Sequence, residues 1–307
     1  MQQQVFLLGA GRSGTTLIQR MFNTYDDVIL WGEHAGFLEQ LADAYFVLKQ
    51  NPSMHEYSYN KRVKDPKIDA LAYYKDPKHW QAWMNWFGPQ NVDDIYRNFL
   101  ESTFNPEHIN KPIWGFKEIR YGRNCKVVRF LQELYPNAIF IAMVRDGLNV
   151  IESQLTTFHQ GTSKYPKLKR ILQLPQLIKI AYNWQKYNAT FLHLQKSSSN
   201  FILLRYEDFI ADRQLIKPIL NKLNLDFTSI QEAVFNLNEG RGSSFEDQTQ
   251  QNERWRVMGW FPIFVAEVII GKSCLILNYP RPKEYFIATK ISGLLAKFTD
   301  LFRKGRV

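Results

Sequence analysis

The stretch VFLLGAGRSGTTL, residues 5–17, constrains the possible fold of this chain more than any other segment. It opens as a short apolar run typical of a buried strand, continues into a glycine-rich turn and ends where a helical pattern begins. In that order, the free N–H groups of the turn and of the helix N-terminus converge on one point and can bind an anion. The stretch therefore predicts an α/β fold with a phosphate-like ligand at the end of the first strand.

The loop departs at one position from a known nucleotide-binding pattern, and this limits the kind of anion that it can bind. The glycines at positions 9 and 14 match the nucleotide-binding loop G-x-x-x-x-G-K-[ST], but Thr15 holds the place of the lysine. In ATPases and GTPases that lysine reaches the terminal phosphates, and the next hydroxyl binds Mg²⁺. Here the cation of the loop is Arg12, and Thr16 is the next hydroxyl. Arg12, Thr15 and Thr16 suit a smaller anion at the 5′ end of a nucleotide; the alternative is a tight turn that binds no ligand.

Apolar runs and helical patterns alternate along most of the chain. With 307 residues, 45% of them hydrophobic, the chain is long enough for one large α/β domain. Strands separated by helices predict a central parallel β-sheet that helices cover on both faces. We expect a single domain over residues 1–280, with a variable helical insertion over residues 40–112. The predicted strands are residues 5–8, 28–31, 138–144 and 201–205, and the predicted helices are residues 15–23, 37–50, 127–134, 149–157, 177–195 and 213–223.

The charge and cysteine content narrow the function classes. The chain has 39 Lys and Arg against 29 Asp and Glu, a net charge of +10 that suits nucleic acid, an anionic membrane or a polyanionic small ligand. The basic residues are dispersed and form no nucleic-acid-binding signature, so we expect no nucleic acid partner. The two cysteines, Cys125 and Cys274, give no disulfide framework and no metal-ligand cluster, and no leader or membrane-spanning segment is recognisable. These features predict a cytoplasmic protein that needs no metal ion.

A second candidate phosphate site lies in IFIAMVRDGLNVIESQ, residues 139–154. A buried strand delivers Arg145 and Asp146 to its carboxyl end, the edge at which ligands of open α/β sheets bind. Ser153 follows eight residues after Arg145 on the next predicted helix, so the guanidinium and the hydroxyl can bind one phosphate together. The alternative is a structural ion pair of Arg145 with Asp146 at the helix start. The presence of the glycine-rich loop favours the phosphate site.

Together these residues resemble the sulfotransferases that use 3′-phosphoadenosine-5′-phosphosulfate (PAPS), most closely the bacterial and tyrosylprotein-type branch. The resemblance runs from residue 4 to residue 280 and implies a P-loop NTPase-like sulfotransferase fold. In that family a P-[RK]-S-G-T-T-L loop binds the 5′-phosphosulfate, and an Arg with a Ser eight residues later, here Arg145 and Ser153, binds the 3′-phosphate. Supporting matches are RYEDF at residues 205–209, RWR at 254–256 and LNYP at 277–280. The matching loop residues are Gly11, Arg12, Ser13, Gly14, Thr15, Thr16 and Leu17.

The resemblance also implies a general base. In this branch a Gly-Glu pair after the phosphate loop supplies it, and here Gly32, Glu33 and His34 follow the predicted strand 28–31. A carboxylate at that place can take a proton from an acceptor hydroxyl or amine. His34 is the rival base, because histidine titrates near neutrality and several cytosolic relatives use one. The resemblance favours Glu33, whose structural alternative is a helix N-cap or an ion-pair partner.

Three further residues complete the implied site. Lys117, in the segment WGFKE, would stabilise charge on the oxygen that bridges sulfate and phosphate, together with the arginine of the loop. Its alternative is an ion pair with Glu118 or Glu33. Arg254 would reach the 3′-phosphate or the 5′ groups, unless it belongs to a solvated basic run. Tyr206 would pack on the adenine or donate its hydroxyl, unless it is a core residue.

The expected function is transfer of a sulfuryl group from PAPS to a hydroxyl or amine of a small-molecule or peptide acceptor. The transfer would be a single in-line displacement with Glu33 as general base and adenosine 3′,5′-bisphosphate as product. Residues 40–112 and 158–176 are the expected acceptor walls. The first of them carries an aromatic stripe on one helical face, which indicates core packing or an acceptor wall. The stripe consists of Trp80, Trp83, Trp86 and Phe87.

Two other classes and one further alternative stay open. A nucleic-acid-binding protein is one class, suggested by the charge and the aromatic residues, although no nucleic-acid-binding signature is present. A P-loop kinase or NTPase would place Thr16 on Mg²⁺ with Asp146 at the acidic strand end, although the loop lysine is missing. A PAPS-binding protein that has lost catalysis would keep the loop, while Glu33 and Lys117 would serve no reaction.

Residues 281–307 form a separate predicted element, a basic amphipathic helix. It suits the surface of a membrane, the chain's own domain or a second subunit of a homodimer. The preceding apolar stretch, residues 260–277, is interrupted by Pro262, Glu267 and Lys272, so it predicts a buried helix. The apolar face of the C-terminal helix consists of Ile287, Ile291, Leu294, Leu295, Phe298, Leu301 and Phe302, and its cations are Lys290, Lys297, Arg303 and Lys304.

Overall fold

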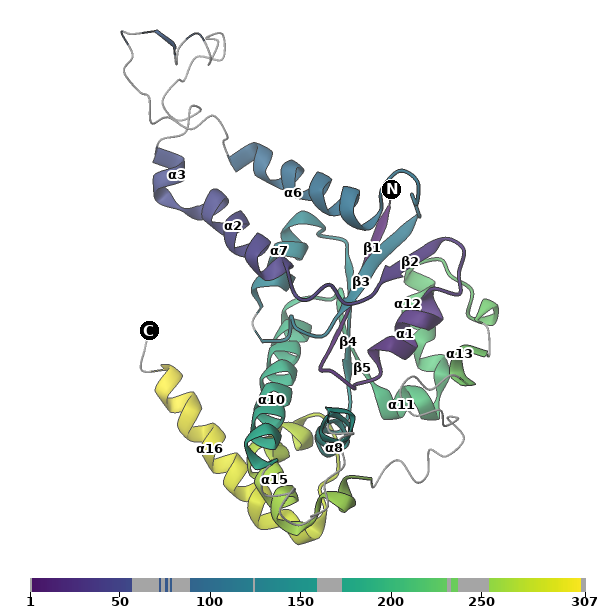
Figure 1. The fold of residues 1–307 in the computed structure, drawn as a ribbon, viewed down its shortest axis with the longest axis vertical. Coiled ribbons are helices and arrows are strands. Elements are labelled where there is room, and N and C mark those ends of the chain that lie inside the picture. The colour runs from purple at the N-terminus through teal and green to yellow at the C-terminus, as the bar shows by residue number, and fades with distance from the viewer. Residues whose placement is uncertain are drawn as a thin grey trace.

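Five parallel strands form one sheet in a computed structural model of the chain (Figure 1). Their order is β2-β3-β1-β4-β5, which confirms the predicted parallel α/β fold. The structure describes residues 2–56, 72, 75–76, 78, 89–123, 125–158, 173–230, 233–236 and 254–304. The strands are β1 (Gln3–Gly9), β2 (Val28–Trp31), β3 (Ile113–Glu118), β4 (Ile139–Val144) and β5 (Phe201–Arg205).

The strand order reverses at β1, because the chain adds β2 and β3 on one side of it and β4 and β5 on the other. At such a reversal the loops after the two central strands turn away from each other, and they leave a crevice at the carboxyl ends of the strands. The glycine-rich loop follows β1 directly, so the topology places it at this crevice. Arg145 and Asp146, which follow β4, belong to the same edge of the sheet.

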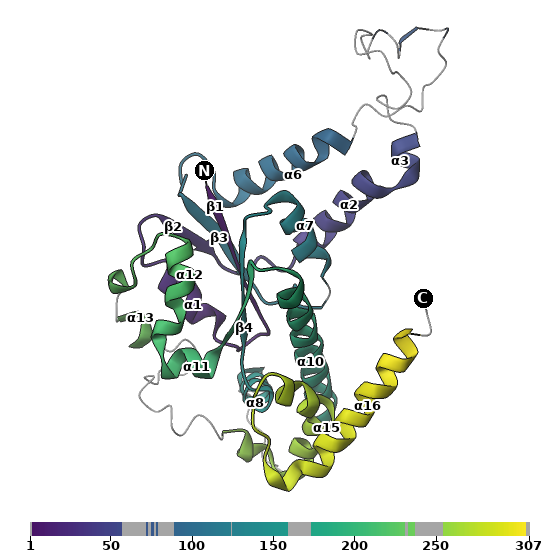
Figure 2. The ribbon, with the colours of Figure 1, turned by 180° about the vertical axis from the view of Figure 1, so that it is seen from behind.

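Helices cover both faces of the sheet (Figures 1 and 2). The shorter helices α1, α11, α12 and α13 lie on one face, and α2, α6, α7 and α10 lie on the other. Farther out, α8, α15 and α16 surround the lower end of α10 (Figure 1). The helices are α1 (Thr15–Phe22), α2 (Leu38–Gln50), α3 (Pro52–Glu56), α6 (Pro89–Phe104), α7 (Lys126–Leu134), α8 (Gly147–Phe158), α10 (Leu174–Ser197), α11 (Tyr206–Ala211), α12 (Lys217–Lys222), α13 (Ala233–Asn236), α15 (Trp260–Ile276) and α16 (Phe286–Lys304).

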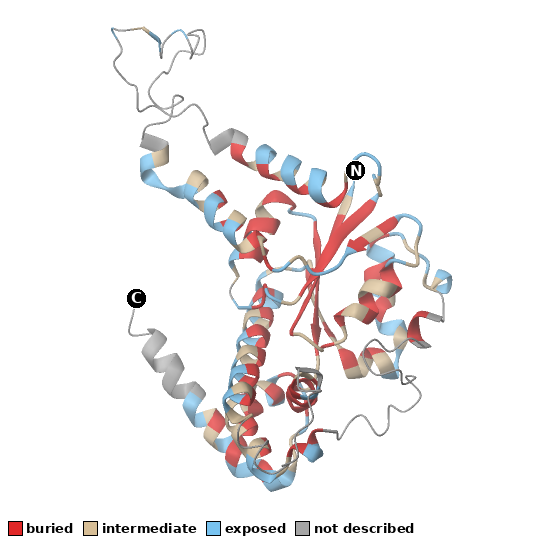
Figure 3. Cartoon of the chain, in the orientation of Figure 1, coloured by how far each residue is buried: buried red, intermediate tan, exposed pale blue. Residues whose placement is uncertain are grey.

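The central strand explains why the fold has two cores. Successive side chains of a strand point to opposite faces of the sheet. In β1, Phe6 and Leu8 join the core beneath α2, α7 and α10, while Val5 and Leu7 join the core beneath α1, α11 and α12. All four are fully buried, as expected for a parallel strand covered on both sides, and the sheet interior is uniformly buried in Figure 3.

One predicted helix is wrong in detail. Residues 213–223 form a 3₁₀ helix, Arg213–Ile216, followed by the short helix α12 instead of one α-helix. Pro218 explains the break, because proline fits the first turn of a helix but not its interior, where its ring and missing N–H disrupt the ladder. The other helices and strands predicted before residue 278 are confirmed within a few residues. The helix predicted over 281–307 is the 3₁₀ helix Lys283–Tyr285 followed by α16, and residues 305–307 lie outside the described residues. The aromatic stripe Trp80, Trp83, Trp86 and Phe87 lies outside the described residues.

The C-terminal part of the described chain is tied to the sheet by a buried ion network. The Arg281 guanidinium lies 2.6 Å from the Asp146 carboxylate, after β4, and 2.7 Å from the Glu267 carboxylate on α15. The predicted helix over 260–277 is α15, which buries its Glu267 side and exposes Trp260 at its start. Burial raises the pKa of Glu267, and the nearby Arg281 charge offsets this in part. Two charged partners at Arg281 therefore fix α15 next to the edge of the sheet that carries the candidate site.

Candidate active site

The loop between β1 and α1 has the strained backbone of an anion-binding turn. Arg12 has a φ of 70° and Gly14 a φ of 91°, both in the left-handed region. Gly14 is also sterically required, because a Cβ at this position would lie 2.3 Å from Cδ2 of Tyr206. Ser13 and Thr15 are buried beneath the turn. The Tyr206 ring therefore closes one side of the loop, which fixes its course.

Both residues of the second predicted phosphate motif meet this loop through Arg12. The Arg145 guanidinium donates a hydrogen bond to the Arg12 carbonyl at 3.1 Å, and Arg12 Nε donates to Ser153 Oγ at 3.1 Å. The Arg145 guanidinium also lies 4.6 Å from the centre of the Tyr206 ring. Arg12, Arg145, Ser153 and Tyr206, from four separate parts of the sequence, thus form one basic cluster beside the loop.

Gln154 is a contact that the sequence did not indicate. Its side-chain amide donates to the Gly11 carbonyl at 2.9 Å, so α8 holds the loop through two consecutive residues, Ser153 and Gln154. The only available signal was its place directly after Ser153. The contact holds the Gly11 carbonyl and so helps to fix the course of the loop.

Two buried polar atoms beside the loop have no hydrogen-bond partner within the described part of the chain. They are Ser13 Oγ and Arg145 Nε. A buried donor without a partner costs free energy, so such groups in a folded protein commonly mark the place of a ligand. Their position beside a helix N-terminus fits an anion with several oxygens, and this is the observation on which a nucleotide phosphate site can be built.

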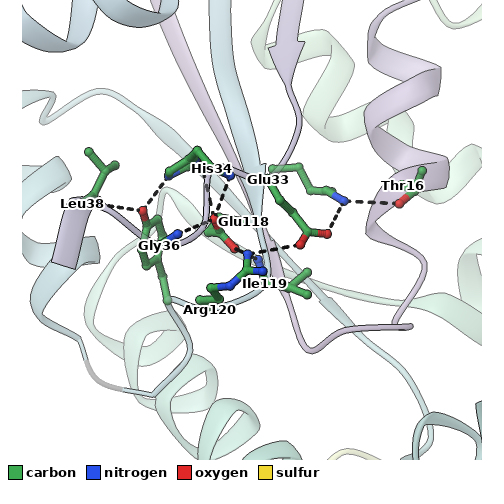
Figure 4. A network of polar contacts seen from close by, with 10 residues as sticks. Thr16, Glu33, His34, Gly36, Leu38, Glu118, Ile119 and Arg120 are labelled. Atoms are coloured by element: carbon green, nitrogen blue, oxygen red, sulfur yellow. Dashed lines mark hydrogen bonds and ion pairs between the residues drawn. The ribbon is translucent and has the colours of Figure 1, made fainter. Parts of the chain in front are cut away.

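A network of charged side chains occupies the carboxyl ends of β2 and β3 (Figure 4). Lys117 Nζ lies 2.8 Å from Glu33 Oε1 and 3.4 Å from Thr16 Oγ1. Arg120 NH1 lies 3.2 Å from the other carboxylate oxygen of Glu33. The structure thus brings together three of the predicted residues, Glu33, Lys117 and Thr16, at the N-terminus of α1. It also adds Arg120, which the sequence did not single out.

Glu118 holds the segment that carries Glu33. Its fully buried carboxylate accepts the N–H groups of His34 at 3.1 Å and Gly36 at 3.0 Å, and it lies 2.6 Å from Arg120 NH1. Burial raises the pKa of Glu118, but the His34 amide and the Arg120 guanidinium lower it more, so that the net shift is downward. A carboxylate with these partners stays ionised and fixes the turn after β2.

His34 points away from Thr16, toward Leu38 (Figure 4). Its Nε2 lies 2.6 Å from the Tyr121 hydroxyl, and its ring packs edge-on against Phe116 with the centroids 4.6 Å apart. Burial lowers the pKa of His34, although the Glu118 charge raises it in part. These contacts make His34 part of the packing beneath the turn and leave Glu33 as the titratable group that faces Lys117.

The last predicted residues have distinct places. Leu17 is buried in the core beneath α1, and its N–H donates to the Gly14 carbonyl at 3.1 Å, so it supports the loop from behind. Arg254 begins the 3₁₀ helix Arg254–Met258, which packs against α8, but its side chain lies outside the described residues. Lys117 forms the ion pair with Glu33 that was its structural alternative.

The model of one protein family matches most of the chain. It describes the sulfotransferase family and matches residues 4–229. The chain is a member of the sulfotransferase family. No curated protein is significantly similar in sequence.

Solved structures similar to this sulfotransferase are also sulfotransferases. The sulfotransferase domain of the Synechococcus PCC 7002 olefin synthase is 18% identical, with 92% of this chain and 96% of that chain covered and a TM-score of 0.49. STF9 from Mycobacterium avium is 12% identical, with 90% and 76% covered and a TM-score of 0.44. STF1 from Mycobacterium tuberculosis H37Rv is 13% identical, with 88% and 77% covered and a TM-score of 0.41.

Two of the supporting motifs build the scaffold of this sulfotransferase. Asp146 caps α8 by accepting the Leu148 N–H at 3.0 Å, and its other oxygen pairs with Arg281. Glu207, from the RYEDF segment, accepts the Asp146 N–H at 3.1 Å and the Tyr279 hydroxyl at 2.8 Å. Asp146 thus pairs with Arg281 and not with Arg145, contrary to the structural alternative for that pair. Asp146 is the acidic residue that a kinase or NTPase would need at the end of this strand for Mg²⁺. Its carboxylate oxygens are already bound to Leu148 and Arg281.

Proposed function

We propose that this sulfotransferase transfers a sulfuryl group from PAPS to a hydroxyl or amine of a small-molecule or peptide acceptor. The observation that carries the proposal is the position of Lys117 Nζ, 2.8 Å from the Glu33 carboxylate and 3.4 Å from the Thr16 hydroxyl. The Lys117 ammonium group therefore connects Glu33, which would accept the proton, to Thr16 of the phosphate loop. It is also a fixed positive charge at this place. Family membership supports the same activity.

The chain's own residues fit a ligand with phosphate groups at both ends of a nucleoside. PAPS supplies the sulfuryl group when bound, and its 5′ groups would be held by the loop amides together with Thr15 and Thr16. Arg145 and Ser153 would hold the 3′-phosphate, because guanidinium groups and hydroxyls form charge-assisted hydrogen bonds to phosphate oxygens. Arg12, expected at the 5′ groups, would also contribute there, because its Nε donates to Ser153 Oγ. The buried, unpaired Ser13 Oγ and Arg145 Nε support this assignment.

The roles of the reacting side chains follow from their contacts. Glu33 would take the proton from the acceptor, and Lys117 would stabilise the negative charge that develops on the leaving oxygen. An ammonium group has three donors, so Lys117 can keep its bonds to Glu33 and Thr16 and direct a third N–H toward the loop. Arg120 and Glu118 fix the Glu33 turn, and His34 packs beneath it.

We propose the acceptor by its chemical class, a hydroxyl or amine on a small molecule or peptide. Of the expected acceptor walls, residues 40–112 and 158–176, the stretches 57–71, 73–74, 77, 79–88 and 159–172 lie outside the described residues. We keep the cytoplasm as the proposed location because the two cysteines, Cys125 and Cys274, are unpaired thiols.

Calorimetric titration with adenosine 3′,5′-bisphosphate tests the proposal, with 5′-AMP and Mg·ATP as comparison ligands. We expect metal-independent binding that requires the 3′-phosphate and weakens about 10- to 100-fold in Arg145→Ala, the range for a lost charged hydrogen bond. Arg129→Ala, an exposed arginine on α7, is the matched control and should bind as the wild type does. Preference for Mg·ATP would overturn the proposal in favour of a P-loop kinase or NTPase.

A further inference from the structure

The last helix, α16, packs on the protein with its small and polar residues. Ala288, Thr289 and Ser292 are buried against α15. Thr289 Oγ1 lies 3.4 Å from Glu267 Oε2, and Ser292 Oγ accepts the Lys272 N–H at 3.1 Å. A surface helix of a globular domain normally turns its apolar stripe to the core and its polar side to water. In α16 the arrangement is reversed.

Several apolar side chains of α16 face outward, and Ile291 among them is half-buried. Ile287 is 69% exposed, Leu294 57% and Leu295 50%, and the spacing of three, four and seven residues places them on one side of the helix with Ile291. We call Ile287, Ile291, Leu294 and Leu295 the outer face of α16. Figures 1 and 2 show α16 at the edge of the molecule, and no element of the described chain lies beyond it. A contiguous exposed apolar stripe of this kind marks an interaction surface.

Cations accompany the outer face. Lys290 Nζ lies 4.6 Å from the centre of the Phe286 ring, and Phe286 is itself exposed. The helix contains four cations, Lys290, Lys297, Arg303 and Lys304, against the single acid Asp300. Exposed apolar side chains next to the exposed Lys290, on a helix rich in cations, complement the surface of an anionic bilayer, where apolar side chains enter the interface and cations contact headgroups.

Charge separates the two possible occupants of this face. In a symmetric dimer the same face of α16 would meet itself, and like charges on the two copies would oppose each other. The chain as a whole carries a net charge of +10, which adds to this repulsion but strengthens attraction to anionic lipid. The charges therefore favour a lipid surface over a second copy.

We propose that the outer face of α16 binds the surface of an anionic lipid bilayer, with the helix lying in the interface. No helix in the described ranges combines the length and apolarity that crossing a bilayer would need, so the contact would be peripheral. This proposal uses no residue of the candidate active site and does not depend on the transferred group.

Vesicle co-sedimentation of the full chain tests the proposal, with phosphatidylcholine vesicles that contain or lack phosphatidylserine. We expect binding to the phosphatidylserine vesicles that falls at high salt, and little binding to phosphatidylcholine alone. The variant I287S/L294S should lower the partition coefficient at least about tenfold by removing apolar burial. The variant K290E/K297E should lower it at least about tenfold by removing attraction to the headgroups.

Matched controls come from other helices. V47S/I178S replaces two exposed apolar residues on α2 and α10, and K179E/K222E replaces two exposed lysines on α10 and α12 with the same change in net charge. Both controls should bind vesicles nearly as the wild type does. Thermal unfolding of every variant confirms that each is folded.

Three outcomes would overturn the proposal. The wild type could fail to bind either vesicle, or I287S/L294S could bind as tightly as V47S/I178S, which would leave only a nonspecific charge effect. Alternatively, light scattering could show a wild-type dimer that I287S/L294S converts to a monomer without any lipid binding. That result would assign the outer face of α16 to a second copy of the chain.

Discussion

The two sides of the glycine-rich loop differ in how completely their polar groups are paired. On the β3 side, Lys117, Arg120 and Glu118 bind one another or the Glu33 turn. His34 Nδ1, which has no hydrogen-bond partner among the described residues, lies 3.9 Å from Glu118. On the β4 side, Ser13 Oγ and Arg145 Nε are buried without partners in the described chain. The first side is already organised, whereas the second has donors available for a ligand. Chemistry and nucleotide binding should therefore respond to different substitutions.

The substitution Glu33→Gln should give the largest difference between the effect on kcat and the effect on nucleotide binding. Loss of a general base lowers the rate about 10²- to 10⁴-fold, so kcat should fall by about 10³-fold. Binding of adenosine 3′,5′-bisphosphate should hardly change, because Glu33 contacts Lys117 and Arg120 and not the basic cluster around Arg145. Steady-state kinetics with PAPS and an acceptor found by screening give kcat, and calorimetry gives the nucleotide affinity.

Glu107→Gln, an exposed carboxylate after α6, is the control for Glu33→Gln and should leave kcat unchanged. A Glu33→Gln enzyme that keeps its full kcat would remove Glu33 from the reaction. Equal losses of kcat and of nucleotide affinity would show that the two sides of the loop act as one unit.

The substitution Gly14→Ala should damage the β4 side. The new Cβ would lie 2.3 Å from the Tyr206 ring at a φ of 91°, so the loop and the ring must move apart. We expect a loss of stability of about 1–3 kcal/mol, typical of a side chain forced into a left-handed backbone, together with weaker binding of adenosine 3′,5′-bisphosphate. Urea unfolding and calorimetry check both effects.

Gly293→Ala is the matched control, because a Cβ at Gly293 on α16 meets nothing within 4 Å. Alanine there should stabilise the helix by about 0.5–1 kcal/mol. If Gly14→Ala and Gly293→Ala changed stability alike, the tight contact between the loop and Tyr206 would not exist in solution.

How far the sequence predicts these sites depends on whether their residues are neighbours along the chain. The loop, Glu33 and the Arg145–Ser153 motif are local patterns at strand ends, and the alternation of strands and helices places them at one edge. Other contacts join residues that are far apart in the sequence. Arg120 contacts a residue 87 positions away, Gln154 one 143 positions away and Arg281 one 135 positions away, and no local pattern specifies such partners. The amphipathic pattern of α16 likewise predicts a helix but not which of its sides packs on the protein.

The substitution Glu118→Gln tests the organised side through stability. Removing the charge leaves Arg120 and two buried amides with a weaker acceptor, so we expect a loss of about 2 kcal/mol near neutral pH, within the range for charged hydrogen bonds. The pKa of Glu118 is lowered in the folded protein, so its charge stabilises the fold above the ordinary carboxyl pKa. That contribution disappears as the pH falls through the folded pKa.

Urea unfolding of the wild type and Glu118→Gln, from neutral pH to below about pH 4, measures this contribution. The difference in unfolding free energy should shrink toward zero as the pH falls. The pKa of His34 is also lowered in the folded protein, so the wild type should already lose some stability as the pH falls below about 6.5, the ordinary histidine value. A difference that grows with acidity would contradict the ionised state of Glu118.

The smallest expected effect, from Ser13→Ala, is also the most specific to the β4 side, because its two consequences have opposite signs. Without ligand, the change removes a buried hydroxyl that has no partner in the described ranges, so the variant should be more stable than the wild type by about 1 kcal/mol. With adenosine 3′,5′-bisphosphate, the same change removes a donor, so affinity should fall about fivefold. In thermal unfolding, the variant should therefore unfold at a higher temperature than the wild type without nucleotide. With saturating nucleotide the two should unfold at nearly the same temperature, because a fivefold loss of affinity costs about 1 kcal/mol of ligand stabilisation. If the Ser13 hydroxyl only packs in the loop, Ser13→Ala should lower stability both with and without the nucleotide. That result would show that Ser13 has no part in binding phosphate.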